Sequence, residues 1–235
     1  LNIYKKNIKS KMNNFVSLVP IRAGSKGLKN KNIAKIKGIP LYLRTVNQAL
    51  RITEKCIINT DIDSILRKKN FDKNVILFER DKKFAEDDTH MNLVLKDLFL
   101  KMNLINKFII LLQATSPLRK DEDIKNAINI FNEGKYSMVM SVRTVESNFL
   151  KYGYEKNDKF IPIAEKFLYK NRQSLPKVLA PNGAIYIFSV NEFLKKNKLP
   201  VKNIGYYEMP AERSIDIDKK EDLNTIRRII SNEIN

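Results

Sequence analysis

The chain has 235 residues, 43% of them hydrophobic, so it is long enough for one large domain, or one domain with a sub-domain. Its 44 Lys and Arg residues outnumber its 26 Asp and Glu residues, and the formal charge of +18 favours anionic ligands. One cysteine excludes an internal disulfide and a cysteine-based metal cluster, and one histidine, His90, leaves little room for Ser-His-Asp catalysis. Because the basic residues are spread along the chain, an anionic small molecule is favoured over nucleic acid as a partner.

The first residues of the chain differ from the rest. Residues 1–14 are basic and polar and lack the apolar segment of a signal peptide, so we interpret them as a disordered tail in which Met12 is an alternative start. No apolar run approaches the length that crosses a bilayer, and no membrane partner is expected. We expect residues 15–235 to form the folded domain.

Short apolar runs and helical spacings alternate along the chain. Strands are predicted at residues 15–20, 56–61, 75–78, 108–112, 138–142, 184–188 and 204–208. Helices are predicted at residues 40–52, 63–69, 89–102, 121–133, 192–196 and 219–234, with Thr89 as the N-cap of the third. This alternation predicts an α/β protein with a doubly wound, mostly parallel sheet. Residues 146–182 break the pattern and are expected to form an inserted arm.

The loop after the first strand, residues 20–32, is basic and contains two glycines. Gly24 and Gly27 would let backbone N–H groups approach a bound anion. Four cations lie around them: Arg22, Lys26, Lys29 and Lys31. In an α/β sheet, a phosphate ligand binds at the loop that follows the carboxyl end of a strand. The loop matches neither GxGxxG nor GxxxxGK[ST], so a solvated basic loop is an equal alternative.

Two carboxylates near the C-terminus, Asp216 and Asp218, stand two residues apart. In an extended segment both would point to one side, where they repel each other unless a cation lies between them. Magnesium with a phosphate substrate is the usual solution, because it takes a few carboxylates and completes its shell with phosphate oxygens and water. The alternative is that Asp218 caps the last helix, with Glu221 completing a capping box, and both roles can coexist.

Two further polar segments lie where ligands bind in such a sheet. Residues 113–119 combine an amide, two hydroxyls and a guanidinium directly after a predicted strand. Asn182 and Gly183 precede another strand. Each segment alone could simply be a turn. His90 is interpreted as a surface or first-turn helical residue in preference to a catalyst.

Taken together, four segments in order resemble one known family. They are residues 20–32, 111–119, 181–187 and 214–218, and the similarity runs from about residue 15 to the C-terminus. The chain resembles the acylneuraminate cytidylyltransferases, or CMP-sialic acid synthetases. This resemblance implies a Rossmann-like nucleotidyltransferase fold, with helices flanking the sheet and a small inserted dimerisation arm. It also implies a cytoplasmic homodimer that joins CTP to a nine-carbon 2-keto sugar acid, with Mg²⁺, and releases pyrophosphate.

The resemblance also implies a role for individual residues. Arg22, Lys26 and Asp216 would be catalytic, the two cations by holding the leaving pyrophosphate. The nucleotide would be bound by Arg22, Ala23, Gly24, Ser25, Lys31, Asn32, Asp61 and Asp87, with Asp88 an alternative to the last because an extra residue leaves the register open. The sugar would be bound by Gln113, Lys151, Arg172, Asn182 and Tyr186. Asp216 and Asp218 would hold the metal.

The sequence departs from the family pattern where the sugar would bind. Ala180 stands where many relatives have an arginine or another polar residue, and Leu199 and Pro200 replace aromatic residues of sialate-specific relatives. Residues 209–214 look more like relatives that act on legionaminic or pseudaminic acid. Sialic, legionaminic and pseudaminic acids therefore stay open as substrates. One alternative is a nucleotidyltransferase of the same fold that acts on another keto sugar acid, such as ketodeoxyoctonate, or uses another nucleotide. The other is a non-catalytic nucleic-acid-binding protein.

Overall fold

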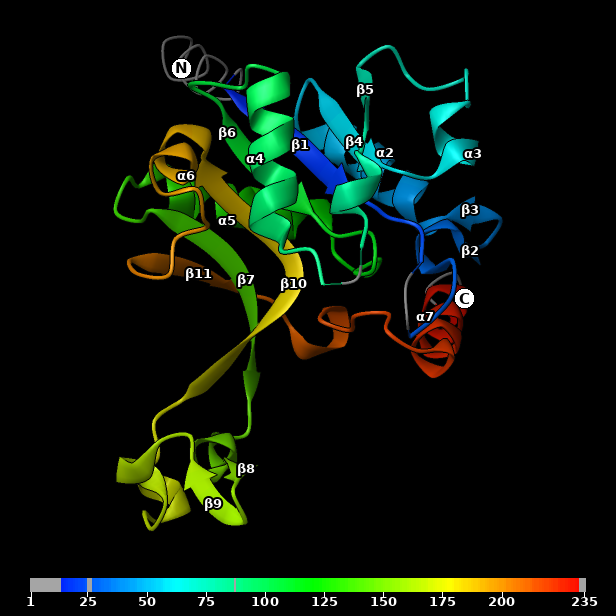
Figure 1. The fold of residues 1–235 in the computed structure, drawn as a ribbon. Coiled ribbons are helices and arrows are strands. Elements are labelled where there is room, and N and C mark those ends of the chain that lie inside the picture. Colours follow the sequence, from blue (N-terminus) through cyan, green and yellow to red (C-terminus); the bar gives the residue numbers. More distant parts are fainter. Residues whose placement is uncertain (1–13, 25–26, 87, 233–235) are drawn as a thin grey trace, which may run out of the picture.

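The computed structural model describes residues 14–24, 27–86 and 88–232. Within these residues, seven strands form the central sheet in the order β11-β7-β10-β6-β1-β4-β5 (Figure 1). The strands are β1 (Phe15–Pro20), β4 (Cys56–Thr60), β5 (Val75–Glu79), β6 (Phe108–Leu112), β7 (Met138–Val145), β10 (Val178–Ser189) and β11 (Ile204–Glu208). Of the seven, β10 alone runs antiparallel to its neighbours, so the predicted mostly parallel α/β sheet is confirmed.

Helices cover both faces of this sheet. The described α-helices are α2 (Leu41–Ile52), α3 (Asp63–Leu66), α4 (Met91–Lys101), α5 (Asp121–Asn132), α6 (Val190–Lys196) and α7 (Lys220–Asn232). Successive side chains of β6 point to opposite faces, and its residues alternate between two hydrophobic clusters. The cluster with Ile110 and Leu112 is completed by α2, α5 and α7, and the cluster with Ile109 and Leu111 by α4 and α6. None of the described helices combines the length and apolar character that a bilayer span requires.

The ends of the elements mostly lie within a few residues of the prediction, and β1, β6 and β11 match it residue for residue. The largest difference is β10, which begins at Val178 because its first residues pair with the end of β7. Its register shifts between Pro181 and Tyr186. The predicted Thr89 cap is wrong: His90 occupies the N-cap position of α4 and makes no side-chain cap hydrogen bond.

The start of α7 also differs from the prediction. The carboxylate of Asp222, and not that of Glu221, accepts the backbone N–H groups of Asp218 and Lys219, at 3.0 and 2.7 Å. The Asp218 carboxylate instead accepts a hydrogen bond from Lys31, with Nζ–Oδ1 at 2.9 Å. The capping box that was the alternative role for Asp218 is therefore not formed.

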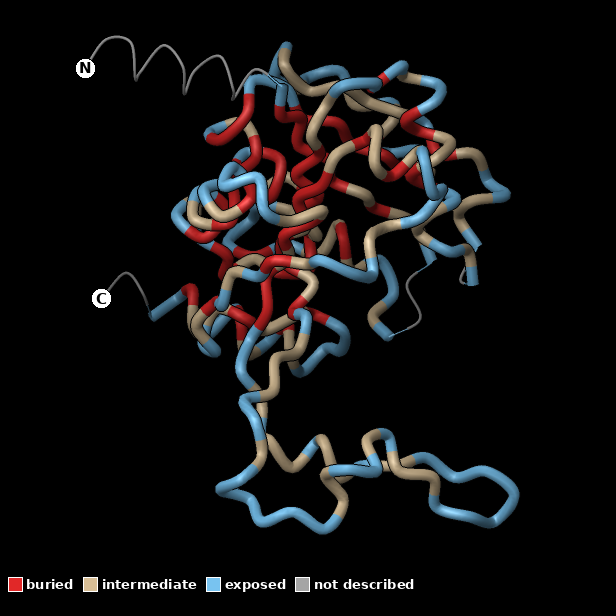
Figure 2. Tube along the Cα trace, turned by 90° about the vertical axis from the view of Figure 1, so that its left-hand side faces the viewer, coloured by how far each residue is buried: buried red, intermediate tan, exposed pale blue. Residues whose placement is uncertain are grey.

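An arm extends from the body of the protein (Figures 1 and 2). β7 and β10 continue beyond the sheet as a two-stranded ribbon whose last pair is Val145 and Val178. The arm carries a hairpin of β8 (Gly153–Lys156) and β9 (Lys159–Pro162) with the short 3-10 helices η3 (Ser147–Lys151), η4 (Glu165–Phe167) and η5 (Arg172–Ser174). Residues 146–177 are all described and none of them is buried. The arm therefore has no core of its own.

A second small hairpin follows the basic loop. It consists of β2 (Lys35–Ile36) and β3 (Ile39–Pro40), which the sequence reasoning did not predict. The 3-10 helix η1 (Lys31–Ile33) precedes it, and Ile36 is buried in the core beside α2. The loop is therefore fixed at both ends by packed structure, with β1 before it and η1 after it.

Candidate active site

Two adjoining pockets open at the edge of the sheet where β1, β4, β5 and β6 have their carboxyl ends. The first has a volume of about 320 Å³ and is bordered by Pro20, Arg22, Gly27, Lys31, Asn32, Arg80, Met91, Gln113, Ala114, Thr115 and Asp218. The second has a volume of about 710 Å³ and is bordered by Gln113, Arg143, Pro181, Asn182, Gly183, Tyr186, Ala211, Ser214, Ile215, Asp216, Asp218, Lys219 and Asp222. Gln113 and Asp218 border both pockets. The two cavities therefore adjoin at these two residues.

The basic loop is held in shape by polar contacts to its backbone. The N–H of Ala23 donates to Oδ1 of Asp61 at 2.9 Å, and the Asn32 amide donates to the carbonyl of Arg22 at 3.1 Å. Gly24 has φ +73°, and a Cβ on Gly27 would lie 2.4 Å from the carbonyl oxygen of Asp218. Glycine is required at the second position because the loop packs directly on the backbone of residues 214–218, the acidic segment.

These contacts separate the predicted nucleotide residues by role. Asn32 borders the first pocket. Asp61 borders neither pocket, and its carboxylate accepts the backbone N–H of Ala23 and so stabilises the loop. Ser25, Lys26 and Asp87, which were predicted to contact the nucleotide, lie outside the described residues. The alternative Asp88 is exposed and borders neither pocket.

Three cations border the described part of the first pocket: Arg22, Lys31 and Arg80. Nη1 of Arg22 donates to the carbonyl of Ala85 at 3.2 Å. Nζ of Lys31 donates to the carbonyl of Ile217 at 3.1 Å as well as to Asp218, so it joins the loop to the acidic segment. A cluster of this charge fits a polyphosphate.

Arg80 was missed by the sequence reasoning. It follows β5 directly and is 4% exposed, and it donates from Nε to Oδ1 of Asn59 at 2.6 Å and from Nη2 to the Asn59 carbonyl at 3.2 Å. Burial lowers the pKa of Arg80 to about 10, the charge of Asp61 opposes that shift, and the charge of Arg22 adds to it. The available signal was a cation two residues after the end of a predicted strand.

Asp216 borders the second pocket, and one of its carboxylate oxygens, Oδ1, is buried. Its Oδ1, and the hydroxyls of Thr115 and Ser116, are buried without a hydrogen bond of normal geometry in the part of the chain that is described. Burial raises the pKa of Asp216, and the charge of Asp218 adds to this, while the nearby Thr115 hydroxyl and the charge of Lys31 oppose it. A carboxylate with one buried oxygen that has no partner, next to a second carboxylate, fits a cation.

Asp216 and Asp218 alone would not complete the coordination shell of a metal ion. Within residues 14–24, 27–86 and 88–232, no group of three or more His, Cys, Asp or Glu side chains is placed to hold a metal ion. Mg²⁺ does not need one, because it is commonly bound through one or two carboxylates plus substrate phosphates and water. Asp216 and Asp218 therefore fit the predicted ion in the presence of a phosphate substrate.

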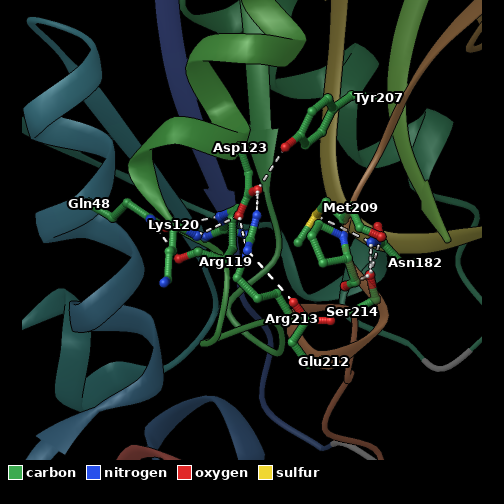
Figure 3. Close-up of polar contacts among 11 residues, drawn as sticks. Gln48, Arg119, Lys120, Asp123, Asn182, Tyr207, Met209, Glu212, Arg213 and Ser214 are labelled. Atoms are coloured by element: carbon green, nitrogen blue, oxygen red, sulfur yellow. Dashed lines mark hydrogen bonds and ion pairs between the residues drawn. The ribbon is translucent and has the colours of Figure 1, made fainter. Parts of the chain in front are cut away.

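The acidic segment is anchored on both sides of its start (Figure 3). The 3-10 helix η6 (Ala211–Arg213) ends at Arg213, whose guanidinium binds the buried carboxylate of Asp123. The Asn182 amide donates to the Ser214 hydroxyl at 3.0 Å and its Oδ1 accepts from the Ser141 hydroxyl at 2.6 Å. Asn182 thus borders the second pocket, but its side chain is already bound on both ends.

Arg119, at the end of the polar loop after β6, is a structural residue. It is 5% exposed and donates to Oε1 of Gln48 at 2.9 Å, to the carbonyl of Gln113 at 3.1 Å and to the carbonyl of Ala184 at 2.7 Å. Burial lowers its pKa to about 10. Arg119 therefore locks the loop that presents Gln113 against β10.

The predicted sugar residues divide into two groups. Gln113, Asn182 and Tyr186 border the second pocket. Lys151 in η3 and Arg172 in η5 are on the arm and border neither pocket. One chain alone therefore brings together three of these five residues.

A mostly parallel sheet with a cationic pocket and a carboxylate pair at the carboxyl ends of its strands is the architecture of an α/β nucleotidyltransferase. The family model described as Cytidylyltransferase matches residues 16–234, and the chain belongs to this family. The resemblance expected from the four segments is thereby confirmed.

The relatives carry names from sugar-acid activation. The chain is 28% identical to N-acylneuraminate cytidylyltransferase of Streptococcus agalactiae serotype V, over 88% of this chain and 51% of that protein. It is 29% identical to CMP-N,N′-diacetyllegionaminic acid synthase of Campylobacter jejuni, over 89% of this chain and 92% of that protein. The chain thus spans about half the length of the Streptococcus relative and most of the Campylobacter one.

Solved structures share the fold. CMP:2-keto-3-deoxy-manno-octonic acid synthetase complexed with CTP matches with a TM-score of 0.65 and 15% identity, over 94% of this chain and 99% of that one. The 4-diphosphocytidyl-2C-methyl-D-erythritol synthase of Anaerococcus prevotii matches with a TM-score of 0.60 and 14% identity, over 94% and 99%. The Rossmann-like nucleotidyltransferase fold is therefore confirmed.

Proposed function

We propose that the protein transfers CMP from CTP to the anomeric hydroxyl of a nine-carbon 2-keto sugar acid of the sialic, legionaminic or pseudaminic type. The observation that carries this proposal is the meeting of two pockets at Gln113 and Asp218, one lined by cations and one by mixed polar groups. The first suits the triphosphate of CTP and the second suits a polyhydroxylated sugar. The relatives named for these reactions support the same assignment.

The reaction is an in-line substitution at the α-phosphorus of CTP. The anomeric oxygen of the sugar forms the new bond to phosphorus, and the bond to the β-phosphate breaks, releasing pyrophosphate. Arg22, Lys31 and Arg80 border the pocket where negative charge develops, and Lys26 joins them in this proposal. Donors held in place before the reaction stabilise the transition state at little cost in reorganisation.

Asp216 and Asp218 are the proposed ligands of Mg²⁺. When bound, such an ion neutralises phosphate oxygens and lowers the pKa of a hydroxyl beside it. Lys31 holds Asp218 at 2.9 Å, and the backbone N–H of Ile217 donates to the carbonyl of Thr115 at 2.9 Å. These contacts fix the segment that carries both carboxylates.

The proposal includes a cytoplasmic homodimer, formed through the arm. The exposed side chains of Phe149, Tyr152, Phe160, Ile163 and Tyr169 are between 45% and 93% accessible, an apolar surface that a second copy would cover. Across such a dimer, Lys151 and Arg172 could contact the sugar that binds to the partner.

A pyrophosphate-release assay tests the function. It crosses CTP, GTP, UTP and ATP with N-acetylneuraminic, N,N′-diacetyllegionaminic, pseudaminic and ketodeoxyoctonic acids. We expect release with CTP and a nine-carbon acid. Release with ketodeoxyoctonate alone, or with another nucleotide, would favour a different transferase of the same fold. Salt-sensitive retention of generic DNA without turnover would favour a nucleic-acid-binding protein.

A further inference from the structure

Three side-chain oxygen atoms at the candidate site are buried and have no hydrogen-bond partner among the described residues. They are Oγ1 of Thr115, Oγ of Ser116 and Oδ1 of Asp216. A buried polar atom that is left unpaired costs free energy, so each one in a folded protein calls for an explanation. Two of these atoms are hydroxyl oxygens, which can donate a hydrogen bond, and the third belongs to a carboxylate, which accepts one when it is ionised.

Thr115 is held against the acidic segment by its backbone. Its carbonyl accepts the N–H of Ile217 at 2.9 Å, so residue 115 lies beside the residue that follows Asp216. The two side chains are close as well: burial raises the pKa of Asp216, and the nearby Thr115 hydroxyl opposes this shift. Thr115 borders the first pocket and Asp216 borders the second. An unpaired donor and an unpaired acceptor therefore lie close together where the two pockets adjoin.

Ser116 offers a comparison within the same loop. It is 2% exposed, against 5% for Thr115, and its hydroxyl is equally buried and unpaired among the described residues. Unlike Thr115, it borders neither of the two pockets. Of these two neighbouring hydroxyls, Thr115 is therefore the one at the candidate metal site.

We propose that the Thr115 hydroxyl donates to Oδ1 of Asp216 when an ion is bound, and that it thereby makes the site select Mg²⁺ over Ca²⁺. The inference rests on the proposed metal role of Asp216. With Oδ1 held by the hydroxyl, the carboxylate has one oxygen left for the ion. Such a carboxylate suits the octahedral shell of Mg²⁺, whereas Ca²⁺ takes more oxygens and often both of one carboxylate. Thr115 is then a positioning residue, which acts on the ion through Asp216.

Thermal unfolding with CTP present and the sugar acid left out tests this inference, because an ion that binds the folded protein raises the midpoint. MgCl₂ and CaCl₂ are titrated separately, in excess over CTP, and each gives the concentration that produces half of the shift. The wild type is expected to require more Ca²⁺ than Mg²⁺. T115V and T115A remove the donor and are expected to reduce the ratio of the two concentrations about tenfold. T115S keeps the donor and should retain the ratio of the wild type.

Two further variants serve as controls. S116A removes a buried hydroxyl that borders neither pocket, so the ratio should stay that of the wild type. D216N should lose most of the shift that Mg²⁺ produces, which shows that the midpoint reports on this site. The midpoints without added metal show that each variant is folded.

The outcomes separate this inference from the function. Folded T115V and T115A proteins that keep the ratio of the wild type overturn the role of Thr115, and so does an S116A protein that reduces the ratio equally. A D216N protein with the full Mg²⁺-dependent shift overturns the metal role of Asp216, and this inference with it. If the ratio changes as expected but the wild type releases no pyrophosphate with any of the acids, Thr115 keeps its role and the proposed function is wrong.

Discussion

The guanidinium of Arg213 binds both carboxylate oxygens of Asp123, with Nη2–Oδ1 at 2.6 Å and Nε–Oδ2 at 3.2 Å (Figure 3). The Asp123 side chain is fully buried, and it also accepts the backbone N–H of Lys120 and the hydroxyl of Tyr207, at 2.7 and 3.0 Å. This network ties the first turn of α5 to the residue that precedes Ser214. The acidic segment therefore starts from a fixed point.

Replacement of Arg213 by glutamine is expected to destabilise the protein by about 3 kcal/mol, because it leaves a buried carboxylate without its charge partner. Urea denaturation of the wild type and R213Q measures the change in the free energy of unfolding. D123N with R213Q provides the control, because a pair that acts together loses less in the double variant than the two single losses summed. Strictly additive losses would show that the two residues stabilise the fold independently.

Asp216→Asn is expected to abolish pyrophosphate release and to leave the fold intact. One carboxylate oxygen is buried, and burial raises the pKa of Asp216, so a neutral amide of the same shape costs the folded protein little or stabilises it. Pyrophosphate release and the thermal midpoint are measured side by side. A D216N protein that turns over at nearly the rate of the wild type would refute the proposed metal role.

Arg80→Met is expected to raise the KM for CTP about tenfold or more while the KM for the sugar acid stays unchanged. Arg80 borders the first pocket and not the second, so its loss should affect the nucleotide alone. Steady-state kinetics with each substrate varied in turn separate the two constants. R67Q is the matched control, since the Arg67 side chain, at the C-cap of α3, is 82% exposed and pairs with Asp63. A rise in the KM for the sugar acid would show that Arg80 acts through the fold.

Acid should remove the stabilising effect of Arg51 on Asp121. Hydrogen bonds from the Arg51 guanidinium, at 2.6 and 2.8 Å, lower the pKa of Asp121 in the folded state below its unfolded value. A depressed folded pKa stabilises the protein above the unfolded pKa of about 4, and this contribution is lost as the pH falls through the folded pKa. R51Q should therefore cost about 0.5 to 1 kcal/mol at pH 7 and progressively less below pH 4.

Urea denaturation of the wild type and R51Q between pH 7 and pH 3 measures this difference. An equal loss of stability at every pH would mean that Arg51 contributes through packing and not through the Asp121 carboxylate.

The strands and helices could be predicted because their signals are local. Residues 108–112 are apolar without interruption, and a central strand covered on both faces requires that. β10 was predicted too short because residues 178–181 are paired with β7, which the local sequence does not show. The small hairpin at residues 35–40 was not predicted because its strands have two residues each, too few for a periodic pattern.

The segments that form the candidate site could be predicted from the sequence, but most of the contacts between their side chains could not. Gln113, Asn182 and the Asp216 segment do meet at one edge of the sheet, as their places after or beside strands indicated. Arg80 acquires its position from Asn59, 21 residues away, and Asp61 supports the loop instead of facing the pocket. Such partners are set by tertiary packing, and no spacing in the sequence encodes them.

The shared border at Gln113 and Asp218 has a kinetic consequence. Because the cavities adjoin, we expect both substrates to be present at once, with the attacking oxygen placed to reach phosphorus directly. No covalent enzyme intermediate is then needed, and each substrate completes part of the other's binding surface. Double-reciprocal plots of the initial rate against the concentration of one substrate, recorded at several fixed concentrations of the other, would therefore intersect instead of running parallel.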